Sequence, residues 1–497
     1  MPKFAVIAAA VALAVSGCTL GPQYRGEAFD LPESWPTTAE QDGAAPSATT
    51  QAEAARWWQS FEDPVLNTLV ERAVAENLDL QLQSARMREA RAQLGFARAE
   101  QWPSLDMQAE ATRQRQPGAT RGLALSDGRA DPITAYTVSG MLSYEIDLWG
   151  RIARGREAAE AVLRQSVFAR DALQLSVIAD VTLMYFNLRS AELQRQIAER
   201  TTQSREESLR LERIRYDAGE ADELSLRQVE SEVAATRMQI PLLIEQQRLL
   251  ESALGVLVGL SPAELMESLQ LDEGELAAIT LPPHAVPTYL PSELLERRPD
   301  LRAAEENLKA ATAGVGVAEA ARLPSLNLVG LIGSVALQGS DLFTGSAEAW
   351  SAGGTITGPL FDFGRSRSRV DQAEARREQA VIQYHAAVNN AFREVRDALA
   401  LMETSAARIE TTQDRIRAVS RTVELAELRY EEGYIGLIEL LDAQRGQLAA
   451  ELEHAEAMSE QLAASAALFK ALGGGWQDPH ADDEEAGHLA APGSPER

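Results

Sequence analysis

Residues 94–107, LGFARAEQWPSLDM, are similar to residues 315–328, VGVAEAARLPSLNL, which lie 221 positions later. Further matches follow in the same order: residues 147–151 (DLWGR) with 361–365 (FDFGR), and residues 215–219 (RYDAG) with 429–433 (RYEEG). Several matches at a near-constant offset indicate a duplicated structural unit. We therefore interpret the chain as a tandem repeat, in which each half has the order helix, two strands, very long helix, turn and returning helix.

The repeat divides the chain into six predicted regions. The prolines of LPPHAVPTYLPSELLERRPD indicate an extended linker between the two halves. The regions are a signal peptide (1–17), an N-terminal anchor and extended segment (18–60), the first repeat (61–275), the linker (276–297), the second repeat (298–476) and an acidic disordered tail (477–497).

Two stretches predict very long helices. Neither residues 156–218 nor residues 365–432 contain Gly or Pro, and the 68 residues of the second stretch would extend roughly 100 Å as a helix. Apolar or small side chains recur there in alternating steps of three and four: Val388, Ala391, Val395, Ala398, Met402, Ser405, Ile409, Thr412, Ile416, Val419, Val423, Ala426 and Tyr430. Such a heptad seam requires a partner helix. On the helices alone, a structural coiled coil is the simpler interpretation.

Four stretches predict strands: residues 104–113, 136–148, 325–337 and 350–360. Three of them alternate between an apolar and a mostly polar side, whereas 325–337 is apolar on both. Strands of about ten such residues fit a transmembrane barrel, and a sheet packed on a soluble core is the alternative. Four strands cannot close a barrel, for which about eight are needed, and an open edge cannot face lipid. If these strands span a membrane, several chains must share one barrel, with the helices forming a second, coaxial tube.

Cys18 is the only cysteine, and it follows the uncharged apolar run of residues 4–15. That run is too short to span a bilayer and is typical of a secretory signal. Residues 15–18, VSGC, resemble the bacterial lipobox, which predicts acylation of Cys18, and Thr19 in place of an aspartate favours the outer membrane. The alternative is an ordinary signal peptide with a chance cysteine.

The composition excludes several functions. The net charge is −27, with 74 acidic against 47 basic residues, and repulsion from phosphate argues against a nucleic-acid partner. No apolar stretch long enough for a transmembrane helix follows the signal. The five histidines lack metal-ligand spacing, and no nucleotide loop or nucleophile motif is present. We therefore expect no enzyme, no metal and no cofactor beyond the covalent lipid on Cys18.

The sequence resembles the TolC-like outer-membrane efflux channels, in the lipoprotein subclass that serves resistance-nodulation-division pumps. The resemblance covers about residues 18–476 and rests on CTLGPQY, WWQSFEDPVLNTLVERAVAENLDL, LLERRPDLRAAEENLKAATAGVGVAEAARLPSLNL, GPLFDFGR, RYEEGYIGLIELLDAQR and ALGGGW. It implies a homotrimer with a twelve-stranded membrane β-barrel, four strands per chain, and a coaxial periplasmic α-helical barrel. A periplasmic adaptor and an inner-membrane transporter would feed this passive exit duct for small toxic compounds or drugs. A lipid-anchored coiled-coil spacer without a pore is the alternative function.

The resemblance also implies functional residues. The positions matching the adaptor-contacting tip are Ala218, Gly219, Glu220, Glu432, Gly433 and Tyr434. The positions matching the periplasmic gate are Ile438, Glu439 and Asp442, and three chains would bring six carboxylates near one axis. The alternatives are that the tip residues are plain helix caps, and that Glu439 and Asp442 are solvated charges on the surface of a coiled coil. Some family members lock the gate with an arginine and an aspartate, whose places are taken here by Ile435 and Ser225; Tyr430 and Tyr216 remain.

Overall fold

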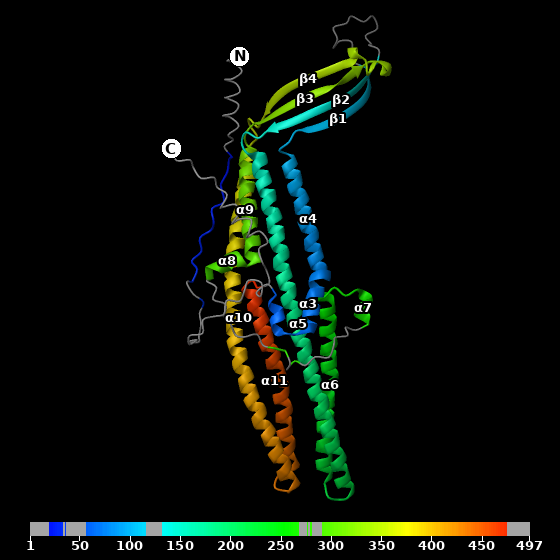
Figure 1. Ribbon diagram of the computed structural model, residues 1–497, viewed down its shortest axis with the longest axis vertical. Coiled ribbons are helices and arrows are strands. Elements are labelled where there is room, and N and C mark those ends of the chain that lie inside the picture. The colour runs from blue at the N-terminus through cyan, green and yellow to red at the C-terminus, as the bar shows by residue number, and fades with distance from the viewer. Residues whose placement is uncertain are drawn as a thin grey trace. The chain divides into compact units, whose positions relative to one another are not determined.

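One antiparallel sheet joins the two repeats in this computed structural model (Figure 1). Its strands lie in the order β1 (Ser104–Gln114), β2 (Ile133–Ile146), β3 (Ser325–Ala336) and β4 (Glu348–Thr357). Strands β2 and β3 come from different repeats and pair from Tyr136↔Ala336 to Ile146↔Leu326. Within the described part of the chain, each outer strand has one partner, so β1 and β4 both present an unpaired edge.

The structure describes residues 19–32, 35, 56–115, 132–267, 276, 279–280 and 291–474. The signal segment, Cys18 and the acidic tail lie outside these ranges, as does most of the linker. In the described residues, no helix contains a stretch that is both long and apolar enough to cross a membrane.

The four predicted strands are all present, with ends shifted by a few residues. Strand β2 ends at Ile146 rather than at residue 148 because Asp147 turns toward the following helix, where its carboxylate accepts a hydrogen bond from Ala153 N at 2.7 Å. Asp362 has the same role after β4 and accepts from Ser366 N at 2.8 Å. In each repeat, the aspartate of the matching DLWGR and FDFGR segments therefore caps the long helix.

The duplication extends to the lengths of the helices. Helices α4 (Leu78–Ala99) and α9 (Pro299–Ala320) each have 22 residues. The long helices α5 (Arg151–Asp217) and α10 (Arg365–Glu431) each have 67, or roughly 100 Å at 1.5 Å per residue. The returning helices α6 (Glu223–Leu257) and α11 (Leu437–Ala471) each have 35. The tandem repeat predicted from the sequence is confirmed.

The chain divides into two structural units, and α5 and α10 contribute to both. The first unit comprises Met1–Ala28, Arg86–Ser166 and Ala303–His385, which include the sheet. The second comprises Phe29–Ala85, Val167–Arg302 and Ala386–Arg497.

The second unit has an aromatic core. Trp57 and Phe61 lie in the 3₁₀ helix η1 (Trp57–Phe61), and Trp57 stacks on Phe469 of α11 with ring centroids 5.3 Å apart. Asp63 caps α3 (Pro64–Glu76) and also accepts the Tyr185 hydroxyl of α5 at 2.5 Å. The short elements are α7 (Pro262–Met266), α8 (Leu294–Arg297) and the 3₁₀ helices η4 (Pro291–Glu293), η5 (Gly339–Asp341) and η6 (Gly345–Ala347).

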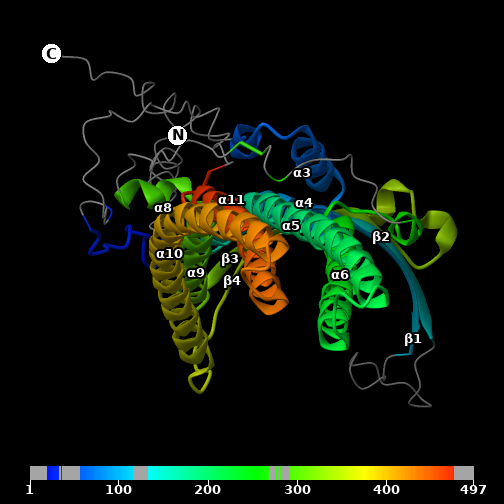
Figure 2. The same ribbon diagram turned by 90° about the horizontal axis from the view of Figure 1, so that it is seen from below.

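The heptad seam of α10 is occupied along its whole predicted length. Every position from Val388 to Tyr430 in the predicted series is buried or half-buried, and Ala391 is fully inaccessible. Helix α11 runs back beside α10, with Arg408 3.5 Å from Glu456, and α6 runs back beside α5 in the same way (Figure 2). The predicted need for a partner helix is therefore met within one chain.

Candidate channel gate and helix tips

The two predicted tips are sharp turns between a long helix and its returning helix. Gly219 and Gly433 have φ of +78° and +77°, which glycine adopts without a steric penalty. In the first tip, Glu220 N donates to Arg215 O at 2.8 Å and Gly219 N to Tyr216 O at 2.9 Å. Tyr434 and Gly433 repeat this pattern in the second tip, which is the hydrogen-bonding scheme of a Schellman helix end.

The six predicted tip residues are all exposed within the chain. They form the two turns that separate α5 from α6 and α10 from α11: Ala218, Gly219, Glu220, Glu432, Gly433 and Tyr434. Tyr434, the one aromatic residue among the six, is 71% exposed. The first returning helix has a side-chain cap, because Asp222 accepts from Ser225 N at 2.7 Å, and this bond lowers the pKa of the Asp222 carboxyl.

The predicted gate residues share one side of α11. Ile438 is 60% exposed and the Asp442 side chain 82%, and Glu439 is exposed as well. Leu440 and Leu441, which lie between Glu439 and Asp442 in the sequence, are buried, at 8% and 5% exposure. Ile438, Glu439 and Asp442 therefore line a surface that the chain itself does not cover.

A buried carboxylate near the gate was not predicted from the sequence. Glu232 of α6 accepts from Arg205 of α5 at 3.1 Å and from Arg445 of α11 at 2.7 Å. Burial lowers the pKa of Arg205, and the charge of Glu232 opposes that shift. Arg445 also lies 3.9 Å from Asp442. The Glu232 carboxylate thus joins helices α5, α6 and α11, which come from both repeats. Through Arg445, this cluster also reaches Asp442, a predicted gate residue.

Tyr430 has polar partners, although Ile435 and Ser225 occupy the positions expected for an arginine and an aspartate. Its hydroxyl donates to Glu212 of α5 at 3.4 Å and accepts from Arg215 at 3.5 Å. Burial raises the pKa of Tyr430, and the Glu212 carboxylate adds to this rise. The contact links the second long helix to the first, close to both tips.

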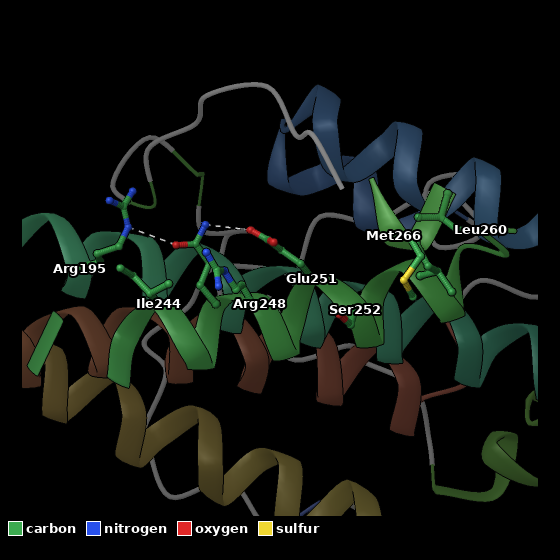
Figure 3. Close-up of a pocket in the computed structure, with 9 residues that line it drawn as sticks. Arg195, Ile244, Arg248, Glu251, Ser252, Leu260 and Met266 are labelled. Atoms are coloured by element: carbon green, nitrogen blue, oxygen red, sulfur yellow. Dashed lines mark hydrogen bonds between the residues drawn. The ribbon is translucent and has the colours of Figure 1, made fainter. Parts of the chain in front are cut away.

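A pocket of about 540 Å³ lies beside α5, α6 and α7 in the second unit (Figure 3). Arg195, Gln247 and Glu251 form a hydrogen-bonded row along it, at 3.2 and 2.8 Å. Its other lining residues are Ile244, Arg248, Ser252, Leu260, Leu265 and Met266. The described residues contain no group of three or more His, Cys, Asp or Glu side chains that could hold a metal ion.

Among the described residues, the four-stranded sheet has two unpaired edges, on the same chain as helices of 67 and 35 residues with glycine at their tips, and this combination fits one subunit of a membrane channel built from several chains. The particular family follows from the sequence as a whole. The chain belongs to the outer membrane efflux protein family, whose model matches residues 69–260 and 290–474.

Named relatives span nearly the whole chain. The outer membrane protein OprJ of Pseudomonas aeruginosa is 33% identical over 480 residues, which cover 96% of this chain and 97% of OprJ. The antibiotic efflux pump outer membrane protein ArpC of Pseudomonas putida is 31% identical over 487 residues, covering 96% and 97%. The Campylobacter jejuni CmeC outer membrane channel superimposes with a TM-score of 0.85 at 25% identity, covering 95% of this chain and 98% of CmeC.

The predicted family and fold class are confirmed by these likenesses. The protein is an outer-membrane efflux channel that extends into the periplasm, and it is mainly α, with a membrane β-barrel and a long α-helical barrel. Its family consists of channels rather than enzymes. The gate, the tips and the lipid on Cys18 stay predictions.

Proposed function

We propose that this chain is the passive exit duct of a tripartite efflux pump, which carries small toxic compounds from the periplasm to the exterior and confers multidrug resistance. The observation that supports this most is the sheet, whose β1 and β4 edges lack partners among the described strands. Backbone groups at such edges cannot be left unpaired in lipid. Three chains would pair β1 of one with β4 of the next and close a twelve-stranded barrel, which is wider than the eight-stranded barrels that side chains fill.

The proposed partners follow from this arrangement. The homotrimer stands in outer-membrane lipid, a periplasmic adaptor contacts the two tips, and an inner-membrane transporter supplies the cargo and the energy. The duct itself catalyses nothing and needs no metal. The relative ArpC is named for antibiotic efflux, and we extend small toxic cargo of that kind to this chain.

The gate is formed by Ile438, Glu439 and Asp442, repeated three times around the axis. A ring of carboxylates at a constriction repels anions and attracts cations. The matching positions of the first repeat carry Leu224 and Gln228, which provides a matched control.

Planar-bilayer recording of the purified protein tests the duct and the gate together. We expect stepwise conductance that rises several-fold in Asp442→Ala, whereas Gln228→Ala leaves it near the wild-type value. A silent bilayer for all forms favours the second candidate, a lipid-anchored spacer without a pore. Equal conductance of Asp442→Ala and wild type, with channels present, excludes Asp442 from the gate.

The tips are tested by charge reversal. Glu220→Lys with Glu432→Lys is expected to weaken binding of the purified adaptor at least tenfold in a pull-down titration. Glu410→Lys is the control. Glu410 is exposed on α10 and precedes Glu432 by 22 residues, which is roughly 33 Å along a helix. Unchanged adaptor affinity in the double variant contradicts the proposed role of the tips.

The anchor is tested at Cys18. We expect labelled palmitate to be incorporated into the wild-type chain and lost in Cys18→Ser. Two or three acyl chains hold a protein on a membrane firmly, because each buried methylene contributes about 0.8 kcal/mol. Incorporation that persists in Cys18→Ser excludes Cys18 as the acylated residue.

A further inference from the structure

The segment that follows Cys18 occupies a site built by both repeats within the first unit. Leu20 N donates to Trp149 O at 3.2 Å, in the loop that joins β2 to α5. Arg154 of α5 donates from Nε to Leu20 O at 3.1 Å and from Nη2 to Gly21 O at 3.5 Å. The Arg154 side chain is only 5% exposed. The carbonyl groups of Leu20 and Gly21 therefore supply acceptors for a buried guanidinium, whose donors would be costly to leave unpaired.

The second repeat supplies the opposite wall. Gly21 lies against Gly316 of α9, so closely that a Cβ on Gly21 would be 2.4 Å from Gly316 Cα. A Cβ on Gly316 would lie 2.8 Å from Leu20 O and 3.0 Å from Arg154 Cγ. Three residues further on, the Tyr24 hydroxyl donates to Glu305 of α9 at 3.0 Å. These contacts leave no room for any side chain at Gly316.

The site lies next to the end of a membrane strand. Thr19 Cγ2 would be 2.9 Å from a Cβ on Gly150, and Gly150 stands between the end of β2 and the start of α5. Thr19 therefore packs against the junction that ends strand β2 and starts helix α5.

We propose that residues 19–24 form an N-terminal strap, which binds the slot formed by Gly150, Arg154 and Gly316 and holds the two repeats together at the base of the sheet. The strap ties the first repeat, through Arg154, to the second, through Gly316 and Glu305. The strap does not depend on the proposed acylation of Cys18.

The chain offers two matched pairs of variants for the test. Gly316→Ala closes the slot, whereas Gly314→Ala, two residues away on α9, adds a Cβ that meets nothing within 4 Å. Arg154→Ala removes the buried donor, whereas Arg156→Ala removes a guanidinium that is 45% exposed on the same helix. Each pair changes the same residue type on the same helix, so general effects on the helix cancel.

A nitroxide on Gln23→Cys reports the strap in the detergent-solubilised full-length protein. Gln23 is exposed, and acylation of Cys18 would leave the introduced cysteine as the sole thiol. We expect an immobilised spectrum in the parent and in both control variants, and loss of the immobilised component in Gly316→Ala and Arg154→Ala. A freely mobile label in the parent, or equal immobilisation in Gly316→Ala and Gly314→Ala, overturns the strap.

The intact mass of the labelled protein separates this result from the fate of the lipid. If the mass shows no acyl chains, the acylation proposed for Cys18 fails, and the strap is tested in a Cys18→Ser background with the same label. If the mass shows the acyl chains and the label is mobile, acylation holds and the strap fails.

Discussion

Glu232 of α6 and Arg445 of α11 are joined by two hydrogen bonds to a single carboxylate oxygen, 3.0 Å from Nε and 2.7 Å from Nη2. The two residues are 213 positions apart and belong to different repeats. The second oxygen of Glu232 accepts from Arg205, whose side chain is 6% exposed. The carboxylate is thus shared between a buried and a half-exposed arginine.

Removal of the shared carboxylate leaves Arg205 buried without its counter-ion. We expect Glu232→Gln to lower the free energy of unfolding by about 3 kcal/mol, the usual cost of breaking a buried ion pair. Arg445 is 51% exposed, so Arg445→Ala is expected to cost below about 1 kcal/mol. Denaturant unfolding of the purified protein, followed by helical circular dichroism, measures both. A larger loss in Arg445→Ala than in Glu232→Gln contradicts this account of the cluster.

Two consecutive arginines between α8 and α9, Arg297 at the end of α8 and Arg298 just before α9, are expected to differ in the same way. The Arg298 side chain is 8% exposed and donates to Ala471 O at 2.9 Å, to Asp300 and to Glu394, both at 2.7 Å. Arg297 is 35% exposed and lies 3.7 Å from Glu293. We expect Arg298→Met to cost about 3 kcal/mol and Arg297→Met below about 1 kcal/mol. The same unfolding measurement compares the two variants. Equal losses in the free energy of unfolding would contradict a larger stabilising contribution from Arg298 than from Arg297.

The long helices and the strands could be predicted because their signals are local. Absence of Gly and Pro, the alternating steps of three and four, and the period-two pattern lie within single elements. Strand β3 gave the weakest signal, since it is apolar on both sides and lies between β2 and β4. Its Gly333 packs on the β2 backbone, which no local pattern reveals.

The cluster around Glu232 could not be predicted for a different reason. A glutamate in an amphipathic helix is normally solvated, and a single sequence contains no sign that Arg205 and Arg445 approach it from two other helices. The contact of Tyr430 with Glu212 was missed likewise, because the family pattern directs attention to position 225 rather than to α5. Pairing across helices is a tertiary property.

The partial burial of His454 predicts that the stability of the folded protein depends on pH. It lies on α11, and its Nδ1 is 3.1 Å from Thr412 Oγ1 on α10. Burial lowers the pKa of His454 below its ordinary value of 6.5, so the folded protein binds this proton more weakly than the unfolded chain does. Its contribution to stability is complete above pH 6.5 and declines as the pH falls toward the lowered pKa. We therefore expect the Tm of wild type to fall more between pH 8 and pH 5 than that of His454→Gln. A parallel fall in both proteins would exclude this residue as a source of acid sensitivity.

Gly333 and Gly353 provide the sharpest test of the sheet. A Cβ on Gly333 would lie 2.3 Å from Val138 O and 2.6 Å from Ser139 Cα, whereas a Cβ on Gly353 meets nothing within 4 Å in the chain. Because backbone atoms of β2 cannot move without breaking the pairing of β2 with β3, we expect Gly333→Ala to cost roughly 1–3 kcal/mol. The variant should show a several-fold loss of oligomer in size-exclusion chromatography of the detergent extract, and a matching loss of bilayer conductance. Gly353→Ala should resemble wild type, since added β propensity is mildly favourable. Normal assembly of Gly333→Ala would contradict the close packing of β3 on β2, and with it the sheet that joins the two repeats.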